Sequence, residues 1–335
     1  MAISISGTSG ISQTGSFDSA STFGFKNRII NGLMTTDQRN AAASQTFTAA
    51  AALAYSVDRW YGYCTGANVT GQQVAGSTTP SVTQFRYRFT GAASVTAVGF
   101  GQRIEQKNSY DLAGSTCTLS ADLAISATLT TVTWTASYAT TTADTFGSLA
   151  SPTITQIATG TFTVSATVTN FTTNISVPAA ATTGIQILFT VGALTAGLTW
   201  TIGNVQLEKG STATSFDYRP YGTELELCQR YFEKSQQNAA GLGGNTIYTA
   251  SVTDQSNNAV YSWKFSIEKR TTPTMTAYQA DGTAGSWGYT RSGASGNATV
   301  NFHNGMTTVA NLYMGIGAAW TGCNIYGNLV ASAEL

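Results

Sequence analysis

The sequence predicts an all-β protein in which an antiparallel β-sandwich is followed by a short helix and a second β-rich domain. Short runs rich in Val, Thr, Tyr, Phe and Trp alternate with turn residues at the spacing of an antiparallel sandwich. Helical periodicity is clearest in one stretch, Thr223–Lys234. A length of 335 residues suits two compact domains and a short extra segment.

Composition favours a folded chain with an unusually neutral surface. Hydrophobic residues make up 42% of the chain and aromatic residues 11%, which is enough to fill cores and argues against disorder. Charged residues make up only 10%, against a usual share of about a quarter. The 16 basic residues balance the 16 acidic ones without a basic run, so we expect neither nucleic acid nor a membrane surface as a partner.

The chain carries no sign of classical secretion or membrane insertion. Met1–Ser9 lacks a basic residue followed by an apolar core, and Ala41–Ala54 is too short and too weakly apolar to span a bilayer. We therefore expect synthesis in a cytoplasm. Four cysteines lie far apart without metal-ligand spacing, and we expect free thiols at Cys64, Cys117, Cys228 and Cys323.

Residues 1–25 are predicted to form an N-terminal arm. The segment is rich in Ser and Gly and has no amphipathic helical period. Such an arm is ordered only where it docks, so it is a candidate attachment segment or a strand added to a neighbour. A tail without a role is the alternative.

Residues 26–222 are predicted to form the sandwich. In Thr128–Tyr138 apolar and hydroxyl residues alternate, which indicates a strand with one wet face. Val132, Trp134 and Ala136 then share the inner face, so Trp134 is expected in the core rather than on a sugar-binding surface. Further strands are expected at 57–63, 84–89, 160–169, 184–191 and 199–207.

A connector helix is predicted over residues 223–235. Thr223 and Glu226 fit a capping box, Glu224 places negative charge at the helix start, and Pro220 prevents continuation upstream. The β-rich region at 236–335 is expected to form the C-terminal tip domain, with strands at 246–252, 259–267, 273–279, 297–302 and 312–320.

No motif for a reaction stands out, and no enzyme, cofactor or metal site is expected. His303 is the single histidine, and the sequence indicates no nucleophile or acidic residue as its catalytic partner. Glycoside hydrolysis needs only two carboxylates, but the acidic residues are scattered and no solenoid repeat is present. A polysaccharide depolymerase is therefore disfavoured. Sandwiches of this kind can hold calcium, but no loop is dense in acids.

Glycan binding without hydrolysis is better supported. It needs exposed aromatic faces for the CH-rich side of a sugar and amide groups for its hydroxyls. Aromatic residues lie among Asn, Gln and Gly in the C-terminal region, and the stretch AGSWGYTRSG resembles a loop. The predicted glycan-binding residues are Trp287, Tyr289, Tyr313 and Trp320.

Several stretches resemble a family of bacteriophage and prophage tail-fibre or virion-appendage proteins. They are KNRIINGLMTTDQRN at 26–40, VDRWYGY at 57–63, VQLEKGSTATSFDYRPYGTELELCQRYFEK at 205–234 and KRTTPTMTAYQADGTAG at 269–285. The resemblance covers scattered blocks of residues 26–285. It implies a jelly-roll sandwich like that of carbohydrate-binding modules, a helix and a β-rich tip, in a homotrimer attached to the virion. It carries over no active site.

Within these stretches we predict structural contacts. Arg28, Asp58 and Arg59 are expected to tie the first strand to the loop before Trp60, with Asp58 and Arg59 as a local ion pair or loop clamp and Trp60 in the core. Gln206 with Glu208 is expected to fix the final strand beside Arg219.

The sequence thus predicts a structural fibre subunit that attaches the virion to the host surface, with a bacterial surface glycan as ligand. The arm would bind other virion proteins. The alternative is a head fibre or capsid decoration protein that binds only virion components, since both need an arm and a trimer.

Overall fold

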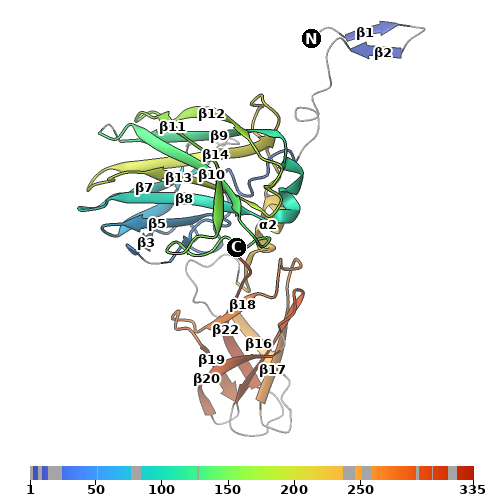
Figure 1. The fold of residues 1–335 in the computed structure, drawn as a ribbon. Helices are drawn as coiled ribbons and strands as arrows, with labels where there is room; N and C mark the ends of the chain where they lie inside the picture. The colour runs from blue at the N-terminus through green and yellow to red at the C-terminus, as the bar shows by residue number, and fades with distance from the viewer. Residues whose placement is uncertain are drawn as a thin grey trace.

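The computed structural model describes residues 3–6, 10–13, 25–50, 52–76, 84–126, 128–236, 246–250, 258–291, 294–303, 305–315 and 323–335. It confirms the predicted all-β class, with an antiparallel sandwich, a short helix and a second β-rich part. Figure 1 shows the two-layered sandwich above, helix α2 at one side of it, and a separate β-rich part, the tip, below.

The sandwich consists of two antiparallel sheets of six strands. The front sheet has the order β11-β10-β13-β8-β5-β4, with β4 (Ala54–Tyr55), β5 (Tyr61–Thr65), β8 (Ala97–Ile104), β10 (Thr131–Ala139), β11 (Ile154–Thr163) and β13 (Ile185–Val191). The back sheet has the order β12-β9-β14-β7-β6-β3, with β3 (Gln45–Phe47), β6 (Val69–Ala75), β7 (Phe85–Thr90), β9 (Thr116–Ile125), β12 (Thr169–Ser176) and β14 (Thr199–Lys209).

Aromatic rings join the two sheets in the core. Phe100 of the front sheet stacks on Tyr87 of the back sheet with ring centroids 4.9 Å apart, and on its other side Trp60 lies 4.9 Å away. Trp60 is fully buried, as expected, and Val132, Trp134 and Ala136 also face the core. Large aromatic rings bury much apolar area, and removing apolar area from water is the main stabilising contribution to folding.

Some strands were not predicted. β6, β8 and β9 contain Gly, Gln, Ser or Asp at positions where a strand signal needs β-branched or aromatic residues. The register of β8 is set by its neighbours, since it pairs with β5 on one side and β13 on the other. Two short 3₁₀ helices, η1 (Gln106–Asn108) and η2 (Tyr110–Leu112), follow β8.

The helix is shorter than predicted. α2 spans Tyr221–Gln229, and Pro220 is its N-cap residue. No side chain caps the helix start, so the capping box of Thr223 and Glu226 does not form. Glu224 instead accepts the backbone N–H of Asn31. Residues 232–234, expected to be helical, form strand β15 (Phe232–Lys234), because pairing with β22 (Cys323–Ser332) satisfies their backbone groups.

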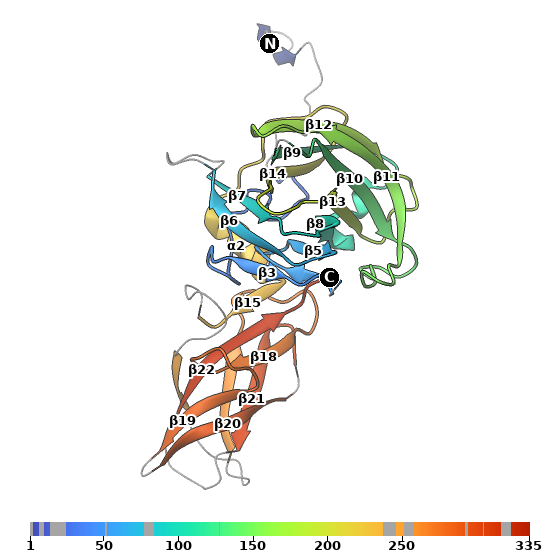
Figure 2. The ribbon, with the colours of Figure 1, turned by 90° about the vertical axis from the view of Figure 1, so that its left-hand side faces the viewer.

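The tip is an eight-stranded antiparallel sheet around β22. Its path is β15-β22-β19-β20-β21-β17, and β16 and β18 also pair with β22. In Figure 2, β15 lies between the sandwich and the other tip strands. The remaining strands are β16 (Thr246–Ala250), β17 (Asn258–Lys264), β18 (Thr274–Tyr278), β19 (Ser286–Arg291), β20 (Ala294–His303) and β21 (Val309–Gly315).

Near the N-terminus, within the predicted arm, β1 (Ile3–Ser6) pairs with β2 (Gly10–Gln13) in antiparallel register. Cys64, Cys117 and Cys228 are buried free thiols. Burial raises the pKa of the Cys228 thiol well above its ordinary value, which keeps it protonated and unreactive.

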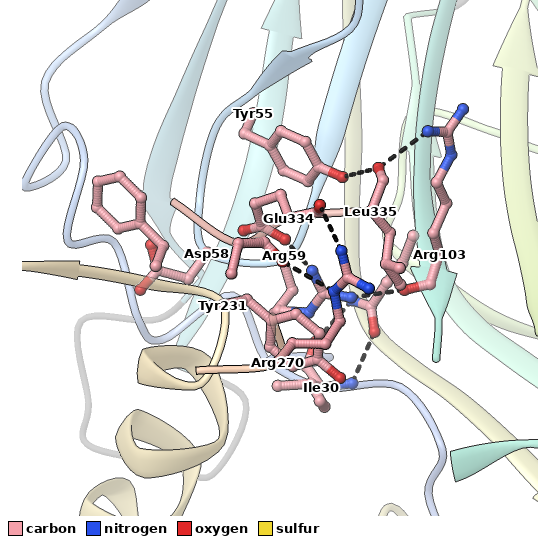
Figure 3. Close-up of polar contacts among 12 residues, drawn as sticks. Ile30, Tyr55, Asp58, Arg59, Arg103, Tyr231, Arg270, Glu334 and Leu335 are labelled. Atoms are coloured by element: carbon pink, nitrogen blue, oxygen red, sulfur yellow. Dashed lines mark hydrogen bonds and ion pairs between the residues drawn. The ribbon is translucent and has the colours of Figure 1, made fainter. Parts of the chain in front are cut away.

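Buried charges join the sandwich to the segment that follows β22, as Figure 3 shows. Glu334 pairs with Arg59, and its other oxygen lies 3.0 Å from Nη2 of Arg39. The Arg59 side chain is 1% exposed and lies with its guanidinium 3.5 Å from the ring centre of Tyr231. Arg39 also pairs with Asp58 at 3.1 Å. Charges this deeply buried must be paired to be tolerated.

Backbone oxygens at the end of β22 are held as well. Arg270 donates to Ala333 at 2.9 Å and to Glu334 at 3.2 Å. The Leu335 oxygen accepts hydrogen bonds from the Tyr55 hydroxyl at 2.7 Å and from Nη1 of Arg103 at 2.9 Å. The contacts of Leu335 with Tyr55 of β4 and Arg103 of β8 fix the segment after β22 against the front sheet.

We expect Glu334→Gln to lower the free energy of unfolding by about 3 kcal/mol or more, because it leaves the buried Arg59 without a counter-charge. The change is measured as a shift of the urea midpoint. Glu226→Gln, on the exposed face of α2, is the matched control and should stay within about 0.5 kcal/mol of the parent. Equal midpoints for the two variants would contradict the role of Glu334.

The buried carboxyl group of Asp58 should make the free energy of unfolding depend on pH. Burial raises its pKa from 3.8 to about 7, although Arg39 and Gln38 favour the charged form. At a pH between these two pKa values, the Asp58 carboxyl group is protonated in the folded chain and ionised in the unfolded chain. The free energy of unfolding should therefore fall as pH rises from 4 to 7, by up to about 1.4 kcal/mol per pH unit. Urea titrations of Asp58→Asn should show a flatter slope than the parent; identical slopes would rule out Asp58 as the cause.

Candidate functional site

The outer face of the front sheet carries a row of paired residues that starts with a tyrosine. Tyr63 of β5 is opposite Gly99 of β8, which is opposite Thr190 of β13, and Thr190 is opposite Thr133 of β10. Residues directly opposite in antiparallel strands point to the same side. Tyr63, Thr133 and Thr190 are half-buried and therefore accessible from this face.

A second row runs beside the first, about 6.8 Å further along the strands. Tyr61 is opposite Gly101, which is opposite Leu188, and Leu188 is opposite Thr135. Leu188 is half-buried, whereas Tyr61 is only 2% exposed. The face thus combines apolar and hydroxyl groups in regular rows.

The two glycines make the tyrosine rings lie flat on the sheet. A Cβ atom at Gly99 would collide with Cε1, Cζ and Oη of Tyr63, and one at Gly101 would collide with Cζ and Oη of Tyr61. Each ring therefore lies across the neighbouring strand β8 instead of standing out from it. A ring held in this way presents a fixed planar surface, with little side-chain entropy left to lose when a ligand stacks on it.

Two adjoining hollows, which we call the groove, follow this face and share Tyr63. The first has a volume of about 160 Å³ and lies against a wall formed by Phe146, Leu149 and Pro152. The second has a volume of about 680 Å³ and lies over Thr133 and Thr190, beside residues 128–131. Apolar ring and methyl surface alternates here with hydroxyl groups.

Arg103 is the only charged side chain among the described residues that line the groove. Nε donates to Oε1 of Gln186 at 3.1 Å, and Nη2 donates to the oxygen of Gly147 at 2.9 Å. Nη1 donates to the Leu335 oxygen, as Figure 3 shows. These hydrogen bonds use about three of the five N–H groups of the guanidinium and hold the wall and the tip segment in place.

The described lining of the groove contains no carboxyl side chain. Glycoside hydrolysis uses two carboxyl groups, and neither hollow is lined by Asp or Glu among the residues that the structure describes. A planar ring, methyl groups, hydroxyls and one amide suit an uncharged ligand that has both CH and OH groups.

Trp287, Tyr289 and Tyr313 lie in the described part of the chain, and their surroundings differ. Trp287 is fully buried, and its Nε1 donates to the Asn328 oxygen at 3.0 Å, so the expected exposure is wrong. Its glycine-rich segment forms strand β19 instead of a loop. Tyr289 packs half-buried against the tip core, and Tyr313 meets His303 edge-on at 6.1 Å. Trp320 lies outside the described residues.

The contacts predicted around Trp60 are partly wrong. Asp58 and Arg59 do not pair with each other, because Arg59 adopts a left-handed backbone conformation (φ 73°) and their partners are Arg39 and Glu334. Arg28 pairs with Asp111 at 2.7 Å instead of contacting the loop before Trp60. Trp60 donates from Nε1 to the Asn31 oxygen at 3.0 Å.

Gln206 and Glu208 do interact, with Nε2 of Gln206 donating to Oε1 of Glu208 at 2.9 Å. Glu208 also accepts the Thr214 N–H at 2.9 Å and the Thr214 hydroxyl at 2.6 Å. Arg219 pairs with Glu224 at 3.4 Å and donates to the Ile29 oxygen at 3.2 Å, whereas Gln206 accepts the backbone N–H of Asp217 at 2.8 Å. The pair fixes the segment after β14 to the back sheet.

We expect Glu208→Ala to lower the free energy of unfolding by about 1–3 kcal/mol, because it leaves buried donors of Gln206 and Thr214 without an acceptor. Thermal unfolding measures this loss. Glu268→Ala, an exposed change, serves as control. Ligand binding in the groove should not change, since Glu208 lies on the back sheet; an unchanged melting temperature would contradict its structural role.

The sequence contained a signal for the groove that the strand analysis missed. YGY at 61–63 and GFG at 99–101 each alternate glycine with an aromatic residue. The first stretch has tyrosines at its two outer positions, and the second has glycines there. Only the register of β5 on β8 reveals that rings and glycines meet.

Comparisons with known proteins found similar solved structures only, each matched over part of this chain. No family model and no curated protein matches the chain. Among solved structures, the enzymatically active domain of tailspike protein 4 of bacteriophage CBA120 is 16% identical with a TM-score of 0.34, over 55% of this chain and 22% of that chain. TmCBM61, solved with β-1,4-galactotriose, is 11% identical with a TM-score of 0.30, over 45% of this chain and 88% of that chain.

The C-terminal family 22 carbohydrate-binding module of Clostridium thermocellum Xyn10B is 13% identical with a TM-score of 0.32, over 48% of this chain and 91% of that chain. What the groove binds is therefore inferred from its own residues. Within the described part of the chain, no helix has the length and apolar character needed to cross a membrane. In that same part, no three His, Cys, Asp or Glu side chains gather as metal ligands would.

Proposed function

We propose that the chain is a non-enzymatic subunit of a bacteriophage fibre or virion appendage, whose groove binds a neutral glycan of the bacterial surface. The flat, half-buried Tyr63 ring over Gly99, beside the hydroxyls of Thr133 and Thr190, carries this proposal. Sugar rings have one CH-rich face that stacks on aromatic rings, while their hydroxyls need neighbouring polar groups.

The low charge of the groove supports an uncharged ligand. Arg103, the single charged side chain of the described lining, is held by hydrogen bonds to Gln186, Gly147 and Leu335. The absence of Asp and Glu from that described lining supports binding over cleavage, so we place a polysaccharide depolymerase behind this function.

The assignment to a phage appendage rests on the stretches that resemble such proteins, including VDRWYGY, which contains Tyr61 and Tyr63 of the groove. In this proposal residues 1–25 bind other virion proteins, residues 26–222 form the glycan-binding sandwich, and residues 236–335 form the tip of a homotrimer located on the virion. A head fibre or capsid decoration protein would share this arrangement but need no glycan.

Tyr63→Ala tests the proposal. Affinity electrophoresis of the full chain through gels that contain neutral bacterial polysaccharides should show retardation, and the variant should bind at least tenfold more weakly, a loss of about 1.4 kcal/mol. Tyr110→Ala is the matched control, because Tyr110 is 59% exposed on η2, outside the groove. Equal retardation of the Tyr63 variant and the parent would refute the groove as the binding site.

A further inference from the structure

The outer face of the tip carries a row that matches the first row of the groove. Tyr326 of β22 is opposite Gly288 of β19, and Gly288 is opposite Asn297 of β20. The order tyrosine, glycine and polar residue on three successive strands is the order found in Tyr63, Gly99 and Thr190.

The contact between ring and glycine is also the same. A Cβ atom at Gly288 would collide with Cε2, Cζ and Oη of Tyr326, which correspond to the ring atoms of Tyr63 that cover Gly99. The Tyr326 ring therefore lies across β19, and it is half-buried, so part of it stays accessible. Gly288 itself is buried beneath it.

Polar, uncharged residues lie on the β19 and β20 side of this ring, whereas Ile247 of β16 is opposite Tyr326 on the other side. Asn297 is exposed, and so are Thr290 and Ser295, which are opposite each other on β19 and β20, and Thr299. None of these residues carries a charge. The Asn297 amide, in register beside the ring, offers both a donor and an acceptor, which the hydroxyls of a sugar need.

We propose that Tyr326 and Asn297 form a second glycan-binding site, in which a neutral sugar residue stacks its CH face on the Tyr326 ring and hydrogen-bonds to the Asn297 amide. The ligand class rests on the proposed function, but the site does not depend on the groove. On such a flat face a single sugar binds weakly. Two sites on one chain raise the avidity for a polysaccharide that reaches both, and several copies of the chain raise it further.

Saturation-transfer NMR on the full chain tests this site, with the methyl glycosides of glucose, galactose and mannose as probes. Tyr63→Ala is used as the background, so that the groove does not contribute. We expect at least one probe to receive saturation from Tyr63→Ala. That signal should be lost in Tyr63→Ala/Tyr326→Ala and reduced at least threefold in Tyr63→Ala/Asn297→Ala. Tyr326→Phe, which keeps the ring, should retain it.

The outcomes separate the two sites. No transfer to any probe in the Tyr63→Ala chain, or transfer that survives Tyr326→Ala, would overturn the tip site. Binding that is lost in Tyr63→Ala alone would keep the groove and reject the tip. Asn297 is exposed, so its variant should fold like the parent, and it tests the site even where Tyr326→Ala changes the melting temperature.

Discussion

A glycine covered by an aromatic ring of the neighbouring strand is the contact on which both the sandwich and the tip depend. Glycine within a strand costs about 0.5–1 kcal/mol relative to alanine, and a ring packed over it offsets this loss. On inner faces such rings fill the cores, and on outer faces they lie flat toward the solvent. The inner pairs include Tyr87 with Gly71, Trp134 with Gly160 and Trp287 with Gly327; the outer pairs are Tyr61 with Gly101, Tyr63 with Gly99 and Tyr326 with Gly288.

Several of the few charges in the chain serve the connection between the sandwich and the tip. Arg59 and Glu334 are nearly inaccessible, and Arg103 uses its donors to hold the groove wall and Leu335. The same residues thus set the position of the tip and leave Arg103 as the only charged side chain among the described residues that line the groove. This low charge follows from where the other charges are buried, as well as from how few there are.

Local patterns in the sequence predicted the all-β class, the helix and the core position of Trp134, because alternation within one strand decides these features. Trp287 was wrongly predicted to lie in an exposed loop, because the glycines around it are typical of loops. In the structure these glycines belong to strands, where Tyr326 covers Gly288 and Trp287 covers Gly327. Phe232–Lys234 were misplaced because their strand partner β22 lies about a hundred residues later in the chain. Sequence spacing contains no information about such pairings.

The groove itself could not be predicted for the same reason. Tyr63 and Gly99 meet only through the register of β5 on β8, and Arg103 is held by Leu335, far away in the sequence. The partner expected for Arg59 was wrong because this buried arginine pairs across the fold with Glu334 and not with the neighbouring Asp58. Arg219 instead pairs locally, with Glu224 five residues further along the chain.

The most direct test is a crystal structure of the full chain soaked with a neutral oligosaccharide that it retains. The account predicts a sugar ring stacked on Tyr63, with hydroxyls near Thr133 and Thr190 and no movement of Arg103. A sugar bound only at another surface, with the Tyr63 ring left uncovered, would contradict it.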